Sequence, residues 1–389
     1  MKKIATALLF LLFTSIASLA QRFDYNVGFD YILSNYEFDA SHGLYDPSYT
    51  LHAVRLTPEA GILLPQSKSV YHRVRAGVDI FRQMGEGLEA PVLFQELVLY
   101  YNVEARLRHG RTINAMAGCF PRRYCTGKGY SGPFFDDDLL YMDPQIEGFM
   151  VNYSRGDRLR SELILDWPGM RGDLLSPERR ERFQVLADGS LRIIGGLGIA
   201  WTGSFYHYAC SVQSPNVVDN HMFYPRVEWH HSFFFKDISL SAGPVLTYQC
   251  DRAVDPAPVF PMGLLSEQSV SKWHLTLANR LYYGDDLMPF YLSSYGGSPY
   301  GRSLYFGDQG FRTLRDDPSW ADWFSLRYEP HISGWLRLQA AVTLYLGEPS
   351  EALGTGVFRG WQQTLRLSLD LDSLRPHPDK PSGRRGVYL

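Results

Sequence analysis

The chain has 389 residues with 38 basic and 41 acidic side chains, and this near balance excludes the basic surface that nucleic-acid binding requires. Aromatic residues make up 14% of the chain, a share typical of β-rich proteins and of membrane interfaces. After residue 20 no run of about 18 uncharged apolar residues occurs, which argues against membrane-spanning helices.

The first twenty residues have the three parts of a secretory signal. Lys2 and Lys3 precede an apolar run over 4–13, and small residues precede a plausible cut before Gln21. No cysteine follows this cut, which disfavours a lipid anchor, and the apolar run is too short to span a bilayer. We therefore expect residues 1–20 to be a signal peptide that is removed on export.

Apolar and polar residues alternate along most of the remaining chain, as in strands with one apolar and one polar face. The clearest segment begins at Leu365, where leucines alternate with Arg366, Ser368 and Asp370. This alternation predicts about 16 strands, with 14 or 18 as alternatives. The expected ranges are 23–32, 49–63, 70–83, 92–108, 111–119, 146–154, 157–167, 180–187, 191–209, 221–231, 237–249, 270–283, 287–294, 322–331, 335–346 and 361–372.

The connections between these strands alternate in length. The long ones include 120–145, 250–269 and 295–321. The short ones are 64–69, 109–110, 155–156, 188–190, 232–236, 284–286 and 332–334. Short periplasmic turns and long extracellular loops are typical of an all-β, antiparallel transmembrane β-barrel, which we expect over residues 21–372. The Pro-rich end, 373–389, is predicted to be a flexible periplasmic tail.

Inward positions on a barrel of this size should be polar and face water. Two interpretations of these charges stay open: they set the electric field of a pore, or they pair with one another across strands. The candidates that would line the pore are Arg73, Arg75, Glu104, Arg106, Arg160, Glu162, Arg327, Arg337, Arg366 and Asp370.

The segment from Phe120 to Pro144 is unusually long for a loop without a helix or strand pattern. We expect it either to fold into the lumen as a constriction or to remain an outer loop with solvated charges. The charged candidates of this constriction loop are Arg122, Arg123, Asp136, Asp137 and Asp138. The aspartates lack the spacing of a calcium loop, so we expect no metal.

Four cysteines would enter an oxidising compartment after export, so disulfides are allowed. Cys119 and Cys125 lie close enough in sequence to pair within one loop, whereas Cys210 and Cys250 both end strands that point the same way. Their spacing makes no zinc motif, and nothing in the sequence predicts a cofactor.

Catalysis has little support in the sequence. Neither G-x-S-x-G nor H-E-x-x-H occurs. His207, Ser211, Asp219 and His221 are expected near the outer rim, where a barrel hydrolase would hold its catalytic groups. A hydrolase therefore stays open as a third alternative, but we expect no enzyme.

In overall organisation the chain resembles the porin-like outer-membrane β-barrels of Gram-negative bacteria. The resemblance covers 21–372 and depends on the alternation, the loop asymmetry and the closing strand over 365–371. It implies the outer membrane as location and, by analogy, passive diffusion of small solutes or ions. The alternative is a non-conducting structural or assembly barrel that docks a periplasmic or surface protein. Outer-membrane lipid is the expected surrounding, a homo-oligomer stays open, and no functional residue is carried over from the family.

Overall fold

The computed structural model describes residues 22–38, 45, 47–85, 96–127, 130–169, 181–209, 216–232, 237–294, 299–351 and 354–372. The expected signal peptide 1–20 and the expected tail 373–389 lie outside the described residues, and both stay predictions.

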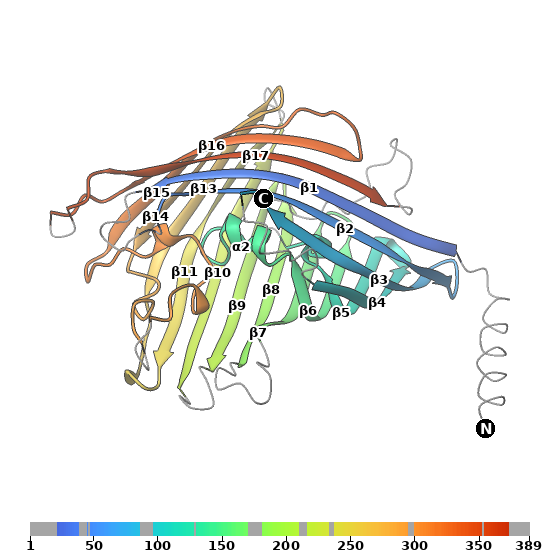
Figure 1. Cartoon of the computed structure of the whole chain (residues 1–389), viewed down its shortest axis with the longest axis horizontal. Coiled ribbons are helices and arrows are strands. Elements are labelled where there is room, and N and C mark those ends of the chain that lie inside the picture. Colours follow the sequence, from blue (N-terminus) through green and yellow to red (C-terminus); the bar gives the residue numbers. More distant parts are fainter. Residues whose placement is uncertain are drawn as a thin grey trace.

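Within these residues sixteen strands close into one antiparallel barrel, as the sequence predicted (Figure 1). Each strand pairs with its neighbours in the chain. Strands β1 and β17 pair from Asn26↔Asp372 to Phe38↔Gly360, which closes the ring. A further short strand, β12, pairs only with the end of β11, beyond the part of β11 that pairs with β13.

The strands are β1 (Arg22–Phe38), β2 (Tyr49–Pro65), β3 (Val70–Gln83), β4 (Glu96–Leu107), β5 (Arg111–Pro121), β6 (Gln145–Arg155), β7 (Leu159–Gly169), β8 (Glu181–Ile194), β9 (Leu197–Ala209), β10 (Val217–His231), β11 (Asp237–Asp251), β12 (Asp255–Val259), β13 (Met262–Lys272), β14 (Leu275–Gly284), β15 (Ser319–Tyr328), β16 (Leu336–Gly347) and β17 (Phe358–Asp372). The helices are η1 (Arg108–Gly110), η2 (Arg122–Tyr124), α2 (Asp137–Met142), η3 (Gly301–Ser303) and η4 (Gln309–Phe311). No helix of the described chain has the length and apolar character needed to cross a membrane.

Burial alternates along the strands. In β4 the side chains of Leu97, Leu99 and Tyr101 are 53%, 49% and 43% exposed, while Val98 and Tyr100 between them are buried. Successive side chains of a strand point to opposite faces, so one face of β4 points into the barrel and the other away from it. An apolar outward face of this kind is the one that contacts lipid.

Connection lengths alternate around the barrel. One end carries the short turns, for example 66–69, 195–196 and 273–274, and the other carries the long loops 122–144 and 285–318. β1 begins and β17 ends at the end with the short turns. This asymmetry assigns the turn end to the periplasm and the loop end to the outside.

Three strand assignments made from the sequence are wrong in detail. β8 continues through the expected turn 188–190 and ends at Ile194, next to Gly195 and Gly196. The expected strand 270–283 spans the end of β13, a turn at 273–274 and β14, while most of β13 and all of β12 lie in the expected long loop 250–269. The expected strand 287–294 forms turns instead. The expected number of sixteen strands is still correct. One expected strand corresponds to two observed strands, β13 and β14, and one expected strand, 287–294, does not form.

Two prolines inside strands leave gaps in the hydrogen-bonded ladder, because proline has no N–H to donate. The pairing of β2 with β3 skips from Leu56 to Glu59, around Pro58. The pairing of β10 with β11 likewise skips from Phe223 to Val227, around Pro225. The barrel therefore tolerates these prolines through local irregularity and stays closed.

Candidate functional site

The loop between β5 and β6 folds into the barrel, and its first residues are fixed to the inner wall. The Arg122 guanidinium lies 3.1 Å from the Asp166 carboxylate of β7 and donates to the carbonyl oxygen of Gln145 at 2.8 Å. Four residues later, the Thr126 hydroxyl donates to the Glu162 carboxylate at 2.9 Å, and the Gly127 N–H donates to the same carboxylate at 3.0 Å. Glu162 therefore holds the loop backbone through these donors. They stabilise a buried carboxylate that forms no ion pair with any side chain of the described residues.

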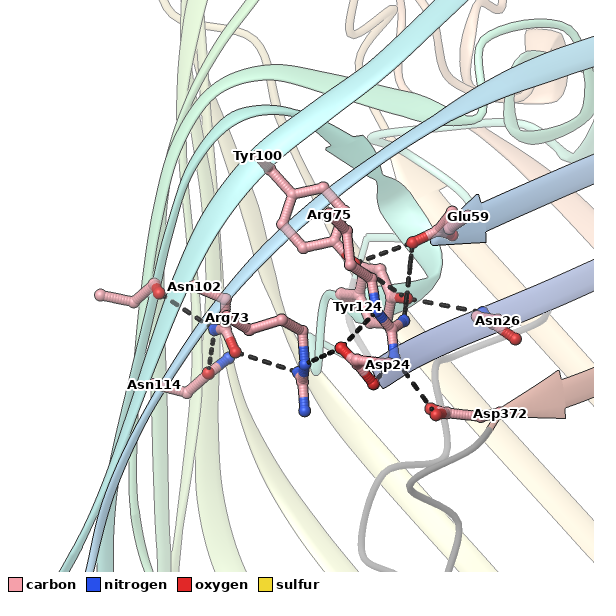
Figure 2. A network of polar contacts seen from close by, with 11 residues as sticks. Asp24, Asn26, Glu59, Arg73, Arg75, Tyr100, Asn102, Asn114, Tyr124 and Asp372 are labelled. Carbon is pink, nitrogen blue, oxygen red and sulfur yellow. Dashed lines mark hydrogen bonds and ion pairs between the residues drawn. The ribbon is translucent and has the colours of Figure 1, made fainter. Parts of the chain in front are cut away.

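A second anchor lies one residue before Cys125, at Tyr124 (Figure 2). The Tyr124 hydroxyl accepts from Arg75 at 2.9 Å and donates to Glu59 at 3.1 Å. Arg75 is bound on its other edge by Asp24, with two N···O distances of 2.7 Å. Arg123 adds an ion pair to Glu59. The loop is thus tied to β1, β2 and β3 as well as to β7.

The end of the loop, α2, touches the wall made by the first three strands. Tyr141 is buried in an apolar cluster with residues of β1, β2 and β3, including Ile32 and Phe81. The guanidinium of Arg55 donates to the carbonyl oxygen of Tyr141, and that of Arg366 lies 5.2 Å above the Tyr141 ring. Figure 1 shows α2 enclosed by the strands, so the loop crosses the lumen.

A second long loop, 285–318, packs against the first from the opposite wall. The Asp136 N–H donates to the carbonyl oxygen of Phe306, and the Asp308 N–H donates to that of Gly132, both at 2.8 Å. Arg302 forms an ion pair with Asp136. Behind these contacts lies a buried apolar cluster shared by the two loops and the wall. Its members include Tyr130, Phe134, Phe135, Leu287, Met288, Tyr291, Tyr305, Phe311 and Trp323.

A cavity of about 1900 Å³ remains beside the packed loops. Its lining includes Arg106 and Gly110 at the turn end, and Phe38 and Tyr49 at the loop end, so it reaches from one end of the barrel to the other.

Charges of opposite sign line the same cavity. The first loop contributes Asp136 and Asp137, and the wall contributes Arg280 and Arg327. Arg280 lies 3.0 Å from the Glu267 carboxylate, whereas Arg327 makes no hydrogen bond or ion pair with the described residues. A wall guanidinium without an ion pair of its own to the described residues, near the carboxylate of Asp137, polarises the passage.

Burial alters the acidity of the loop carboxylates. It raises the pKa of Asp137 above the ordinary value of 3.8, and the nearby Arg280, Arg327 and Arg366 oppose this without cancelling it. Burial also raises the pKa of Asp308, which accepts from the Gly310 N–H and from Trp323 Nε1.

Most of the residues predicted to line a pore face the lumen. Arg75, Glu162 and Arg366 do not line the cavity, because Arg75 and Glu162 hold the first loop and Arg366 binds Asp30 at 3.0 Å and stacks on Tyr141. Those that do line it are Arg73, Glu104, Arg106, Arg160, Arg327, Arg337 and Asp370.

Of the expected constriction residues, Arg123, Asp136 and Asp137 line the cavity, and Arg122 lies behind it. Asp138 belongs to α2, but its side chain lies outside the described part of the chain. The sequence did not identify Asp308, Arg302 or Arg280. The only signal for the second loop was its length.

Cys119 and Cys125, which the sequence allowed to pair, are both free. Cys119 pairs with the outward-facing Leu99, whereas Cys125 is buried inside the barrel, so the two side chains lie on opposite sides of the wall. Cys250 is also free, and Cys210 lies outside the described residues. The part of the chain that the structure describes contains no cluster of His, Cys, Asp and Glu that could hold a metal ion.

Solved structures with this architecture are outer-membrane proteins. The loop L8 deletion mutant of OmpT, an outer membrane protein of Vibrio cholerae, is 10% identical with a TM-score of 0.51, over 90% of this chain and 100% of that one. OccAB1 of Acinetobacter baumannii is 10% identical with a TM-score of 0.50, over 90% of this chain and 97% of that one. No family model and no curated protein matches the chain. The chain thus has the fold of the porin-like outer-membrane β-barrels.

Proposed function

We propose that this barrel is a passive channel for small solutes or ions, narrowed by its two inward-folded loops. The observation that carries the proposal is the cavity of about 1900 Å³ whose lining includes residues at both ends of the barrel. A structural barrel has no need of such a passage, whereas a diffusion channel requires one.

The charges along the passage support selection by charge. Asp136 and Asp137 of the first loop and Arg280 and Arg327 of the wall all line the passage, and low-dielectric walls strengthen the field of these charges. A solute that passes between these groups would be oriented by its own charge distribution. Neutralising one side should therefore change which ions pass most easily.

Recordings in planar lipid bilayers test the proposal. The purified protein should insert in discrete conductance steps, and the double variant Asp136→Asn, Asp137→Asn should shift the reversal potential toward anion preference. Asp317→Asn is the matched control, because Asp317 is exposed in the second loop outside the cavity lining and its neutralisation should leave selectivity unchanged. Conductance indistinguishable from that of the lipid alone would remove the proposal.

A non-conducting barrel that docks a protein partner is the second candidate. The observation that favours it is the buried aromatic cluster between the two loops, which fills part of the lumen. Under this alternative the wild-type protein conducts no ions in the same recordings and a second protein co-purifies with it.

The proposal assigns no catalytic step to the barrel. His207 lies 3.2 Å from Asp219, as in a catalytic pair, but the Asp219 carboxylate is also bound by Arg252 at 2.7 Å. The candidate nucleophile Ser211 lies outside the described residues. An assay with ester and peptide substrates should therefore give no turnover above that of a His207→Ala variant.

A further inference from the structure

Polar side chains lie on the outward face of three neighbouring strands, where lipid contact calls for apolar ones. Asn279 of β14 pairs with Gln268 of β13 on one side and with Phe324 of β15 on the other. Two residues further along β14, the outward-facing Leu281 pairs with Ser266 and Asp322. Paired residues of adjacent strands share a face, so the side chains of Ser266, Gln268, Asn279 and Asp322 all point to the outer side of the wall, although the positions of Gln268 and Asn279 also border the cavity. These four residues are the outer polar patch.

The patch lies between two apolar levels of the same wall. Toward the loop end it is bordered by the pair Tyr283–Trp320, and Tyr283 is 57% exposed. Toward the turn end it is bordered by the pair Leu277–Leu326, at 44% and 49% exposed, and then by Tyr328. Aromatic girdles mark the two interfaces of an outer-membrane barrel. The patch is therefore at the level of the hydrocarbon.

The contacts within the patch satisfy only part of its hydrogen-bonding capacity. The Asn279 amide donates to the Asp322 carboxylate, and Gln268 Nε2 donates to the Ser266 hydroxyl at 2.5 Å. A carboxylate accepts about four hydrogen bonds and each carboxamide oxygen about two, so acceptors remain at Asp322, Gln268 and Asn279. Polar groups left without partners in hydrocarbon are costly, and a charged one on the lipid face of a barrel is destabilising.

We infer that the outer polar patch is a lateral interface that binds a second copy of this chain within the membrane. The patch holds donors and acceptors together, with a hydroxyl, two carboxamides and a carboxylate. Its chemistry is therefore complementary to itself. A two-fold axis through the patch apposes it to the same patch of the other copy, so that each copy supplies amide donors to the Asp322 of its partner.

A head-to-tail ring fits these observations less well. It would press the patch against a different stretch of outward wall, and β4, for example, presents Leu97, Leu99 and Tyr101 there. Such a contact would bury Asp322 against apolar side chains with no new donor. The two-fold dimer leaves neither patch in lipid.

The mass of the protein in lipid nanodiscs tests the inference, measured by light scattering or native mass spectrometry. The wild-type protein should be a dimer, and the triple variant Gln268→Leu, Asn279→Leu, Asp322→Leu should be a monomer with the strand content and heat-modifiable migration of the wild type. The apolar replacements suit lipid contact, so the barrel itself should still fold. Ser161→Leu on the outward face of β7 is the control and should remain a dimer.

Cross-linking gives a second measurement that does not depend on the triple variant. The variant Leu277→Cys, next to the patch on its turn-end side, should yield more disulfide-linked dimer than the wild-type chain. The wild type is the reference because it measures any cross-linking through the four native cysteines. A cysteine at Leu163 of β7 should yield no such increase. A monomeric wild type, a dimer that persists in the triple variant, absence of the Leu277→Cys cross-link, or a different protein bound at the patch would each overturn the inference. None of these outcomes depends on whether the barrel conducts.

Discussion

Arg75 is the cation to which carboxylates of the first and the last strand are both bound. Its guanidinium contacts Asp24 at 2.7 Å, Asp372 at 3.3 Å and Glu59 at 3.6 Å, and only 1% of the side chain is exposed. Since Asp24 belongs to β1 and Asp372 to β17, this one residue links the two strands whose pairing closes the barrel to the loop anchor at Tyr124. This role depends on β1, β2, β3, β17 and the first loop all being in place.

Replacement Arg75→Leu leaves Asp24 and Glu59 buried with less positive charge nearby. We expect the free energy of unfolding to fall by about 3–5 kcal/mol, as when one partner of a buried ion pair is removed. Urea unfolding in phospholipid vesicles measures this loss. Tyr124→Phe removes a single hydroxyl from the same network and should cost only about 1 kcal/mol. Equal losses in the two variants would contradict the central role of the guanidinium.

The raised pKa of Asp137 makes the selectivity of the passage depend on pH. A carboxyl with a raised pKa takes up its proton at a higher pH than an exposed aspartate, so as the pH is lowered its negative charge is lost in an interval above the one in which an exposed aspartate is protonated. Anion preference should therefore increase over this interval. The folded chain also holds this proton more tightly than the unfolded chain, so the same fall in pH stabilises the folded loop.

Reversal potentials measured in a salt gradient from pH 7 to pH 4 test this prediction. Asp137→Asn should reproduce the low-pH selectivity at every pH and lose most of the dependence. A wild-type selectivity that stays constant down to pH 4 would show that Asp137 carries no charge relevant to permeation.

At the scale of single elements, the hairpin between β13 and β14 is strained. Its two turn residues, Trp273 and His274, have φ values of 51° and 72°, a region that favours glycine. The strain is retained because the turn holds Trp273 at the periplasmic interface, where its side chain is 76% exposed and Lys272 lies 4.4 Å above the ring. His274 makes no comparable contribution through its side chain.

We therefore expect His274→Gly to raise the free energy of unfolding by about 0.5–1 kcal/mol, because relief of the left-handed strain exceeds the added chain entropy. Gly196→Ala, in the two-residue turn between β8 and β9, tests the same argument in the opposite direction, because it introduces strain instead of relieving it. Gly196 has a φ of 86°, and a Cβ there would lie 2.0 Å from the carbonyl oxygen of His230, so this change should destabilise by about 2 kcal/mol. Unfolding curves that rank the two variants the other way would contradict the strain argument.

The same hairpin shows where the sequence misleads. Trp273 and His274 are not turn formers, so alternation alone reads straight through 270–283. The opposite error occurred at Asp188-Gly189-Ser190, which has the composition of a turn but lies in β8. There the ring of Trp201 on β9 occupies the space beside Gly189, within 2.1 Å of where a Cβ would be. Contacts between strands override local preference in both cases.

At the scale of the whole molecule, the period of two along the chain was enough to predict a closed antiparallel barrel with loops of unequal length. Closure follows from physics that every strand shares, because a spanning sheet leaves no edge unpaired in lipid. The packing of one loop on the other does not follow from any period. Contacts such as Phe306 with Asp136 join segments far apart in sequence, and they depend on which inner side chains leave room. Asp308 and Arg302 therefore gave no signal, whereas Asp136 and Asp137 were found from their place in an acidic run.

The orientation of the barrel in the outer membrane leads to a prediction about accessibility from outside the cell. Ala253 is exposed in the turn before β12, at the end with the long loops, and Ser67 is exposed in the short turn between β2 and β3. If the short turns face the periplasm, a membrane-impermeant maleimide added to intact cells should label Ala253→Cys and spare Ser67→Cys. The wild-type chain gives the background from its own cysteines. After permeabilisation both variants should be labelled equally, because both sites are exposed. Labelling of Ser67→Cys but not Ala253→Cys on intact cells would show that the barrel has the opposite orientation, with the constriction loop on the periplasmic side.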